Sequence, residues 1–471
     1  MAKIINTRSP FYVKIADSNL DSAKLKLYIY EGVKKTSLDS ADLKYTITKS
    51  ELEANNYVVF EISELVRDYI ETKYDGEYDS YCVWVIIDVS VSDTNGNPIY
   101  SWTSTPSEVQ NIKTSGTATQ SVVGSLVDDT ASFTSTVSVG DIAVDPQGNT
   151  ANVTFINSDT QIILDGNIFL EGEAYFITSG YYSFLATEGY GYFEEGINPD
   201  FDEGLMIPEG NIYRVNDRSI NIPVSAETTN SVSFRLNGET IYTKSISYAN
   251  PSFPTTSEVI QYIASDGNST ADSYIERVLE SQGGVFENNT LLEAFEEEVD
   301  LGEIDEIYVN YTNATETKTK VLKVKTFDCS KYEPIRVTFV NKFGALQDMY
   351  FTRRSNESVN VKTEDYKASV MDFDFANFSY DTSSHQMRTL NLVGNESITL
   401  NTDYIDESCN EHIKQLMLSE QIWMTRLTDE EKIVPLKLKS NSLQLKKRVN
   451  DKLIQYTMEF DVAADIINNI R

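Results

Sequence analysis

Apolar and polar side chains alternate along much of this chain, and this alternation constrains the fold more than any other feature. In residues 24–30, Leu25, Leu27 and Ile29 fall on one face, whereas Lys24, Lys26 and Tyr28 fall on the other. A repeat of two residues is typical of a half-buried β-strand. Further strands are predicted at 11–15, 57–60, 81–91, 153–185, 336–340, 349–351, 443–445 and 454–460. The 28 tyrosines and 21 phenylalanines also favour sheet.

Helical spacing is confined to short segments. In residues 61–73, apolar side chains recur every three or four positions, and Ser63 is placed to cap the first turn. Ser408-Cys-Asn-Glu411 reads as a capping box that opens a helix carrying Ile413, Leu416, Met417 and Trp423. Two more helices are predicted at 271–280 and 291–299, the first closed by Gly283-Gly284.

Turn signals and length suggest the domain organisation. Turns are expected at 93–98, at Asn237-Gly238 and at 341–344. At about 100–200 residues per domain, 471 residues make roughly three domains. We expect a mainly β chain with α insertions, built of serial β-sandwich domains that each carry one or two short helices. The expected domains are 1–210, with a Ser/Thr-rich insertion near 104–150, 211–328, with a helical insertion near 271–300, and 329–471, with one capped helix.

The charge balance limits contact with nucleic acid. The chain has 39 Lys and Arg against 72 Asp and Glu, a net charge of −33. Such a surface repels phosphate, so general DNA binding is disfavoured. The same charge suits a wall along which DNA passes without sticking, so DNA is expected at most as passing cargo.

The sequence shows no signature of catalysis, metal binding or cofactor binding. Cys82, Cys329 and Cys409 are far apart, which argues against a disulfide framework or a four-thiol site. Cys409 and His412 could share a helix face, but zinc needs three or four ligands. Neither a nucleophile elbow nor a phosphate-binding loop occurs. The chain lacks a signal-peptide pattern and a membrane-spanning run, so synthesis in a cytoplasm and no membrane span are expected.

Acidic and aromatic residues between Glu188 and Glu203 leave other site classes open. Two carboxylates suffice for glycoside hydrolysis, but no pair stands out among 72 acids. Tyr190 and Tyr192 could contact sugar, or could lie in a loop that makes protein contacts. Calcium at Asp93, Asn95 and Asn97, or at 200–203, lacks a terminal Glu, so a turn and a solvated loop are the better interpretations.

A basic segment reverses the sign of the chain near its end. Its members are Lys437, Lys439, Lys446, Lys447, Arg448 and Lys452. It could contact an acidic patch on a neighbouring copy, contact DNA, or form solvated hairpin edges that lysine protects from unwanted pairing. Together with Tyr190 and Tyr192, these residues are the candidate partner interface.

Several stretches resemble virion proteins of crAss-like and related phages of gut Bacteroides. They are Arg8-Ser-Pro-Phe-Tyr12, Leu25-Lys-Leu-Tyr-Ile-Tyr-Glu-Gly32, Phe60-Glu-Ile-Ser-Glu-Leu-Val-Arg-Asp-Tyr69, Phe339-Val-Asn-Lys-Phe-Gly-Ala-Leu346 and Lys447-Arg-Val-Asn-Asp-Lys-Leu453. The resemblance covers about the first hundred and the last hundred and forty residues. It carries no active-site residues.

The resemblance implies a structural protein of a short-tailed virion. Copies would form a cyclic ring of the tail barrel, twelvefold as one option, around the DNA-ejection path and beside other tail proteins. We therefore expect a non-enzymatic tail protein located in the virion. The alternatives are a receptor- or glycan-binding protein on the tail exterior and, less favoured, a polysaccharide depolymerase.

Overall fold

The computed structural model describes most of the chain outside its central acidic region. It describes residues 2–245, 257–262 and 304–467, apart from 32–34, 36, 51–55, 71, 77–81, 100–101, 110–111, 147–148, 192–195, 199, 202–204, 216–219, 226–228, 313–315, 328–330, 375–376, 381, 427–428, 441, 443 and 446–453. The helices expected at 271–280 and 291–299 lie outside the described residues.

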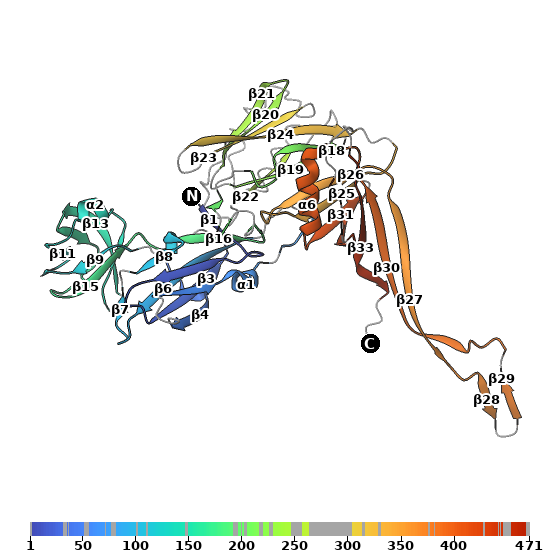
Figure 1. The fold of residues 1–471 in the computed structure, drawn as a ribbon, viewed down its shortest axis with the longest axis horizontal. Helices are drawn as coiled ribbons and strands as arrows, with labels where there is room; N and C mark the ends of the chain where they lie inside the picture. The colour runs from blue at the N-terminus through green and yellow to red at the C-terminus, as the bar shows by residue number, and fades with distance from the viewer. Residues whose placement is uncertain are drawn as a thin grey trace. The chain divides into compact units, whose positions relative to one another are not determined.

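The chain is mainly β, with serial β-sandwich domains and few short helices, as its alternating pattern predicts (Figure 1). The chain divides into two compact units, each with most of its contacts within itself. Unit 1 comprises 1–72, 80–202 and 248–256, and unit 2 comprises 73–79, 203–247 and 257–471. The expected three-domain division stays a prediction. No described helix has the length and apolarity needed to cross a membrane.

Two sheets form the first sandwich of unit 1. The larger runs in the order β17 (Asp200–Phe201), β1 (Ala2–Asn6), β16 (Ser183–Thr187), β6 (Val83–Ser92), β3 (Ser22–Tyr30) and β4 (Leu43–Ser50), with β7 (Pro98–Ile99) beside β6. The smaller contains β5 (Tyr57–Glu61), β2 (Tyr12–Ala16) and β8 (Thr103–Thr105). Leu25, Leu27 and Ile29 are buried between the sheets, as predicted. Tyr28 is also buried, because a second apolar cluster covers the other face of β3.

The helix expected at 61–73 is confirmed but short. Helix α1 covers Ser63–Arg67, and Ile62 is its N-cap. The predicted cap by Ser63 is wrong, because Glu61 Oε1 accepts the bond from the Ser63 backbone N–H at 2.9 Å. A 3₁₀ turn, η1 (Ser40–Asp42), precedes β4, and η2 (Ser107–Val109) follows β8.

The Ser/Thr-rich stretch is part of a folded module within unit 1. Its sheet runs in the order β10 (Gln120–Val122), β11 (Ser125–Val127), β14 (Gln161–Leu164), β13 (Thr150–Ser158), β12 (Ile142–Val144), β15 (Ala174–Thr178) and β9 (Ile112–Thr117). With helix α2 (Phe133–Thr136), it encloses a core that includes Leu126, Phe133, Ile162 and Tyr175. The module extends beyond the expected insertion, because β13, β14 and β15 complete its sheet.

Unit 2 begins with a five-stranded sheet and a separate strand pair. The sheet order is β18 (Gly210–Val215), β24 (Thr317–Phe327), β23 (Glu306–Thr312), β20 (Thr229–Leu236) and β21 (Glu239–Ser245); β19 (Ile220–Ser225) pairs with β22 (Ser257–Tyr262). The hairpin predicted at Asn237-Gly238 is confirmed, and both residues have positive φ, 52° and 86°. Asn and Gly tolerate this conformation better than other residues.

A seven-stranded sheet forms the rest of unit 2. Its order is β26 (Leu346–Phe351), β25 (Ile335–Val340), β31 (Ile422–Arg426), β32 (Asp429–Leu438), β33 (Thr457–Ile467), β30 (Met387–Asn401) and β27 (Asn356–Lys367). Helix α6 (Asn410–Leu418) follows the 3₁₀ turn η5 (Glu407–Cys409) and buries Ile413 and Leu416 in the core. The hairpin predicted around 341–344 is confirmed by the pairing of β25 with β26.

Three details near the chain end differ from expectation. Trp423, expected on the helix, lies in β31, because α6 ends at Leu418. The capping box at Ser408–Glu411 is wrong: Asp406 accepts the bond from the Ser408 N–H at 3.0 Å and caps η5, from which α6 continues. The strand predicted at 443–445 is wrong at Gln444 and Leu445, which belong to no strand, while residue 443 is not described. The last predicted strand, 454–460, is confirmed from Thr457 onward, where β33 (Thr457–Ile467) begins, whereas Ile454 forms only an isolated bridge with Ile405. Its apolar side chains, Ile454, Tyr456, Met458 and Phe460, are all buried.

Candidate functional site

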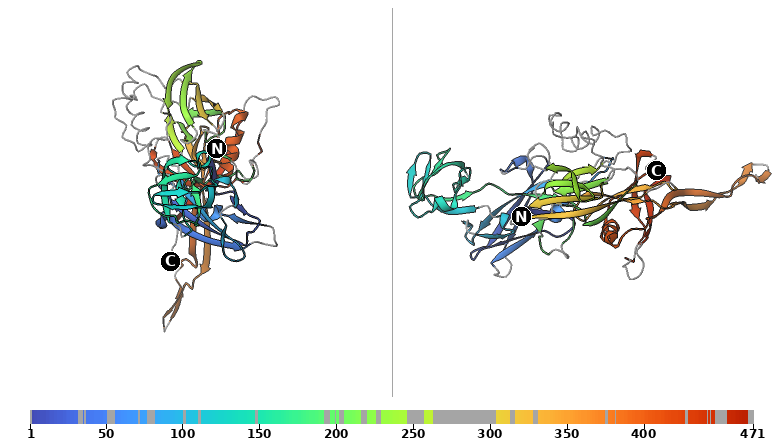
Figure 2. Two further views of the ribbon diagram at one scale, coloured as in Figure 1. Left: turned by 90° about the vertical axis from the view of Figure 1, so that its left-hand side faces the viewer. Right: turned by 90° about the horizontal axis from the view of Figure 1, so that it is seen from above.

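A long two-stranded ribbon leaves the seven-stranded sheet of unit 2. Strands β27 and β30 pair antiparallel from Asn356 opposite Thr399 to Lys367 opposite Met387. Strand β33 flanks β30 only from Gly394 to Asn401. The outer part of the ribbon, in which β30 comprises residues 387–393, therefore consists of β27 and β30 alone among the described residues. These two strands lead to the small hairpin of β28 (Met371–Asp374) and β29 (Asn377–Tyr380) (Figures 1 and 2).

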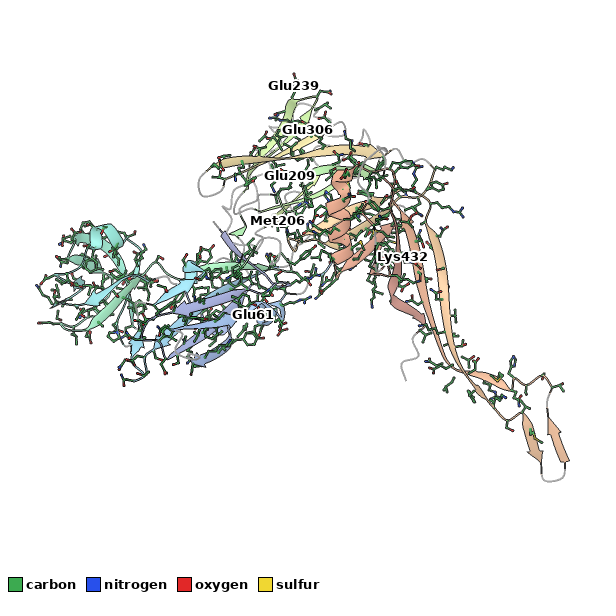
Figure 3. All side chains as sticks on the ribbon, in the orientation of Figure 1. Glu61, Met206, Glu209, Glu239, Glu306 and Lys432 are labelled. Carbon is green, nitrogen blue, oxygen red and sulfur yellow. The ribbon has the colours of Figure 1, made fainter. Side chains whose placement is uncertain are left out.

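Within the described part of unit 2, neither strand β27 nor the segment 387–390 of β30 is covered by a second layer. Every residue of β27 is exposed, and its side chains stand free on both sides (Figure 3). Val359 and Val361 are 59% and 57% exposed although they alternate as a strand core would. On β30, Met387 and Leu390 are each 53% exposed. Apolar side chains of both strands are therefore left open to water, and on β27 they follow the regular alternation of a strand.

Such a ribbon is poorly stabilised by its own contacts. A single two-stranded hairpin is marginally stable in water, and a long bare strand edge presents unpaired backbone groups. A strand of another protein can pair with each edge through backbone hydrogen bonds, and apolar side chains of a partner can cover the faces. The arrangement is suited to assembly through backbone hydrogen bonds and apolar contact.

No motif of the sequence singles out this ribbon. The alternation of Val359 and Val361 with polar residues, matched by Leu390 and Leu392, is the signal that could have indicated it. That signal predicts a strand pair with one apolar face. It does not reveal that the face remains uncovered.

The predicted basic segment is only partly described. Lys446, Lys447, Arg448 and Lys452 lie outside the described residues. Lys437 is exposed at the end of β32. Lys439 Nζ binds Glu459 Oε1 at 2.7 Å, and this hydrogen bond raises the pKa of Lys439. Lys439 is therefore engaged by its own chain.

Of the two tyrosines predicted to make partner contacts, Tyr190 is described and Tyr192 is not. The Tyr190 ring is half-buried, and the guanidinium carbon of Arg8 lies 5.2 Å from its centre. Nearby, the buried carboxylate of Glu188 accepts a hydrogen bond from Thr72 Oγ1 at 3.0 Å. These internal contacts hold Tyr190 and Glu188 in the fold of unit 1, and Glu194 and Glu195 are not described.

The oxygen-rich turn at 93–97 is built from its own hydrogen bonds. Asp93 Oδ1 accepts the backbone N–H groups of Asn95 and Asn97, each at 2.8 Å. The Asn97 side-chain amide donates to Asp93 Oδ2 at 3.0 Å, and Gly96 has φ 81°. Hydrogen bonds with Asn97 lower the pKa of Asp93. Both carboxylate oxygens thus serve the predicted turn.

Cys409 and His412 point to different partners. Cys409 Sγ donates to the Asn211 carbonyl oxygen at 3.3 Å, and burial raises the pKa of this thiol to about 12. His412 Nδ1 bonds the side-chain amide of Gln347. Among the described residues, no three His, Cys, Asp or Glu side chains gather as metal ligands would.

Burial of His412 predicts a pH-dependent stability. Its pKa falls from 6.5 to about 4 because the charged form is desolvated. Between these values the unfolded chain binds the proton and the folded chain does not, so stability drops as pH falls from 6.5 towards 4. The loss approaches about 3 kcal/mol. Urea unfolding at pH 7 and pH 4.5 should show a smaller loss for His412→Gln than for the wild type. Equal losses would contradict the prediction, since the carboxylates titrate alike in both proteins.

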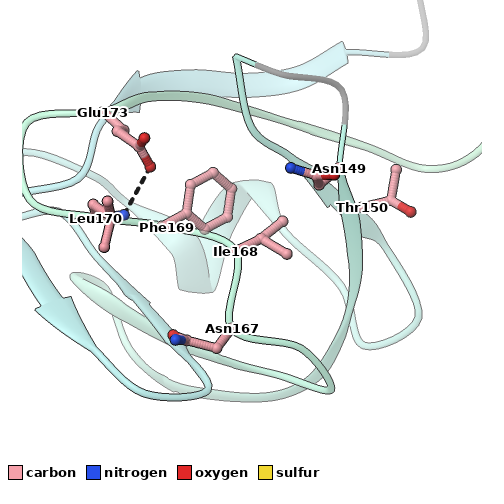
Figure 4. A pocket seen from close by; sticks show the side chains of 7 residues that line it. All are labelled: Asn149, Thr150, Asn167, Ile168, Phe169, Leu170 and Glu173. Carbon is pink, nitrogen blue, oxygen red and sulfur yellow. Dashed lines mark hydrogen bonds between the residues drawn. The ribbon is translucent and has the colours of Figure 1, made fainter.

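An open hollow on the module of unit 1 offers few free polar groups. Asn149, Thr150, Asn167, Ile168, Phe169, Leu170 and Glu173 line it (Figure 4). Glu173 Oε2 accepts the Leu170 N–H at 2.8 Å. The Asn149 side-chain amide donates to Asp145 Oδ2 at 2.7 Å. Two of the four polar side chains that line the hollow, Asn149 and Glu173, are thus already bonded within the module, and the ribbon remains the stronger candidate for a functional site.

Comparison with known proteins assigns no family. No family model matches the chain, and no curated protein matches it. Solved structures that align include E. coli alpha-2-macroglobulin, at 9% identity and TM-score 0.15. The alignment covers 98% of this chain, which spans only 39% of the length of alpha-2-macroglobulin. The I67–I69 fragment of titin aligns at 10% identity and TM-score 0.14, over 60% of this chain and 88% of the fragment. The Bacteroides ovatus glucan-utilisation protein SGBP-B aligns at 10% identity and TM-score 0.13, over 83% of this chain and 86% of that protein's chain. TM-scores this low carry no argument about function.

Proposed function

We propose that the chain is a non-enzymatic structural protein of a bacteriophage tail. In this proposal, copies assemble with one another and with other tail proteins into a ring or barrel around the DNA-ejection path. The uncovered ribbon of β27 and β30 carries the proposal, because its bare edges and exposed valines favour a protein partner. The resemblance of the two chain ends to phage virion proteins supports the same assignment.

The charge of the chain is compatible with this role. A net charge of −33 gives passing DNA no general surface on which phosphate contacts could form. It also makes copies of the chain repel one another at long range. Contacts between copies must then rely on short-range interactions. Backbone hydrogen bonds between paired strands and contacts between apolar side chains are interactions of this kind.

Assembly can be tested with a shortened ribbon. In the variant, a Gly-Asn-Gly turn replaces residues 360–393, so that only the base of the ribbon remains. We expect the full chain to form closed rings in negative-stain images and the shortened chain to stay monomeric, because the edges that join copies are gone. Light scattering at matched concentration measures the same difference.

Two controls make the result interpretable. Calorimetric transitions of the shortened chain should match those of the full chain, since the removed residues contribute little buried surface. Mass spectrometry of purified virions should detect the chain in the tail. Monomers from the full chain, together with its absence from virions, would contradict the proposal.

A further inference from the structure

The outer part of the ribbon has two free edges. Among the described residues, β27 pairs only with β30, and β30 has no second neighbour between Met387 and Val393. Two copies placed side by side can therefore join the free edge of β27 to the free edge of β30. The strand directions alternate in such an arrangement, so every new pair is antiparallel.

The charges on one face specify which residues meet. Tyr366 lies opposite Arg388, and Glu364 is two residues from Tyr366, so all three side chains share a face. Glu364 makes no ion pair among the described residues, and Arg388 is the one charged residue of β30 between 387 and 393. Among the described residues, Arg388 donates only to the carbonyl oxygen of its neighbour His385, at 3.3 Å. Opposite charges are thus available on the two free edges.

We propose that the free edge of β27 pairs with the free edge of β30 in a second copy of this chain, with Glu364 opposite Arg388. The proposal rests on the proposed function, for which it names the contact between copies. Each copy uses one edge as donor strand and the other as acceptor strand, so the contact is head-to-tail, and it gives a ring where the rotation between neighbouring copies adds up to a full turn. Closure leaves no free edge on the ribbons. Pairing of two identical β27 edges would give only dimers.

Cysteine cross-linking between two variants tests the register. One preparation carries Glu364→Cys, the other carries Arg388→Cys, and the two are mixed in equal amounts and oxidised. Because directly opposed residues bring their Cβ atoms within disulfide range, the mixture should give a cross-linked band. Neither variant alone should give one. The unsubstituted chain is the blank, as its described cysteines, Cys82 and Cys409, are buried.

A matched control moves one partner along the same face. When Lys362→Cys is mixed with Arg388→Cys, the two cysteines lie two residues out of register, about 7 Å apart along the strand. This mixture should not cross-link. Charge exchange gives a second readout: Glu364→Arg and Arg388→Glu should each abolish rings, and the double variant should restore them.

The outcomes separate this contact from the proposed function. Rings of the full chain without a cross-link in the mixture would overturn the pairing while leaving the tail assignment intact. Dimers from Glu364→Cys alone would overturn it in favour of a two-fold contact. Absence of rings would count against the proposed function itself.

Discussion

Replacement of Asn341 by leucine should lower the free energy of unfolding of unit 2 by about 4 kcal/mol. Asn341 is completely buried in the turn between β25 and β26. Its Oδ1 accepts the N–H groups of Phe343 and Ala345, at 2.9 and 3.1 Å. Its Nδ2 donates to the Met206 carbonyl oxygen at 2.7 Å and to Gln347 Oε1 at 3.2 Å. Leucine has the same branching and number of heavy atoms as asparagine but would leave these buried groups without partners.

Calorimetry of the full chain measures the effect. We expect the transition of unit 2 to fall by roughly 10 °C, at about 2–4 °C per kcal/mol for a unit of this size. The transition of unit 1 should not move. Asn356→Leu, at an exposed position of β27, is the matched control and should change stability by less than about 0.5 kcal/mol. An equal effect of the two substitutions would show that the hydrogen bonds of Asn341 are not the cause.

Replacement of Gly116 by alanine should destabilise unit 1 by about 3 kcal/mol. Gly116 in β9 lies opposite Tyr175 in β15. A Cβ atom at Gly116 would lie 2.3 Å from Asp128 Oδ2 and 2.7 Å from Tyr175 Oη. Tyr175 donates to Asp128 Oδ2 at 2.7 Å, and both side chains are buried, so neither can turn away into solvent. The added methyl group must therefore separate a buried hydrogen-bonded pair.

A second glycine of the same module provides the control. At Gly166 the nearest atom to an added Cβ is the Ala151 Cβ at 3.3 Å, which requires only a small shift. We expect Gly166→Ala to cost less than about 1 kcal/mol. Calorimetry should show the Gly116→Ala shift in the transition of unit 1 alone. Similar values for both glycines would contradict the clash as the cause.

Part of the fold follows from local pattern. The alternation in 24–30 predicts β3, and Asn237-Gly238 predicts its hairpin, because strand period and positive φ depend on residues close in sequence. Helix caps are less predictable. Ser63 and Ser408 have suitable side chains, yet the N-caps are Ile62 for α1 and Asp406 for η5, and the N–H groups of the two serines are bonded by Glu61 and Asp406 instead.

The candidate site is harder to predict from sequence pattern than the strands and turns are. The sequence drew attention to Lys439 and Tyr190, whereas Lys439 binds Glu459 and the Tyr190 ring lies against Arg8. Charge and aromatic content mark these residues as possible contacts, but their partners come from distant positions in the chain. The ribbon is the reverse case: its sequence has an ordinary strand pattern, and this pattern does not indicate that its side chains are exposed.

The sequence by itself determined the β class, the turns and the acidic character of this protein, because each depends on residue type and short-range spacing. Tertiary structure alone decided which alternating strands receive a second layer and which do not. Val337 in β25 and Val361 in β27 both occur in alternating strands, yet the first is fully buried and the second is 57% exposed. The difference arises because Val337 packs in one core with Ile413 and Leu416 of α6, whereas β27 is the edge strand of its sheet and all of its residues are exposed.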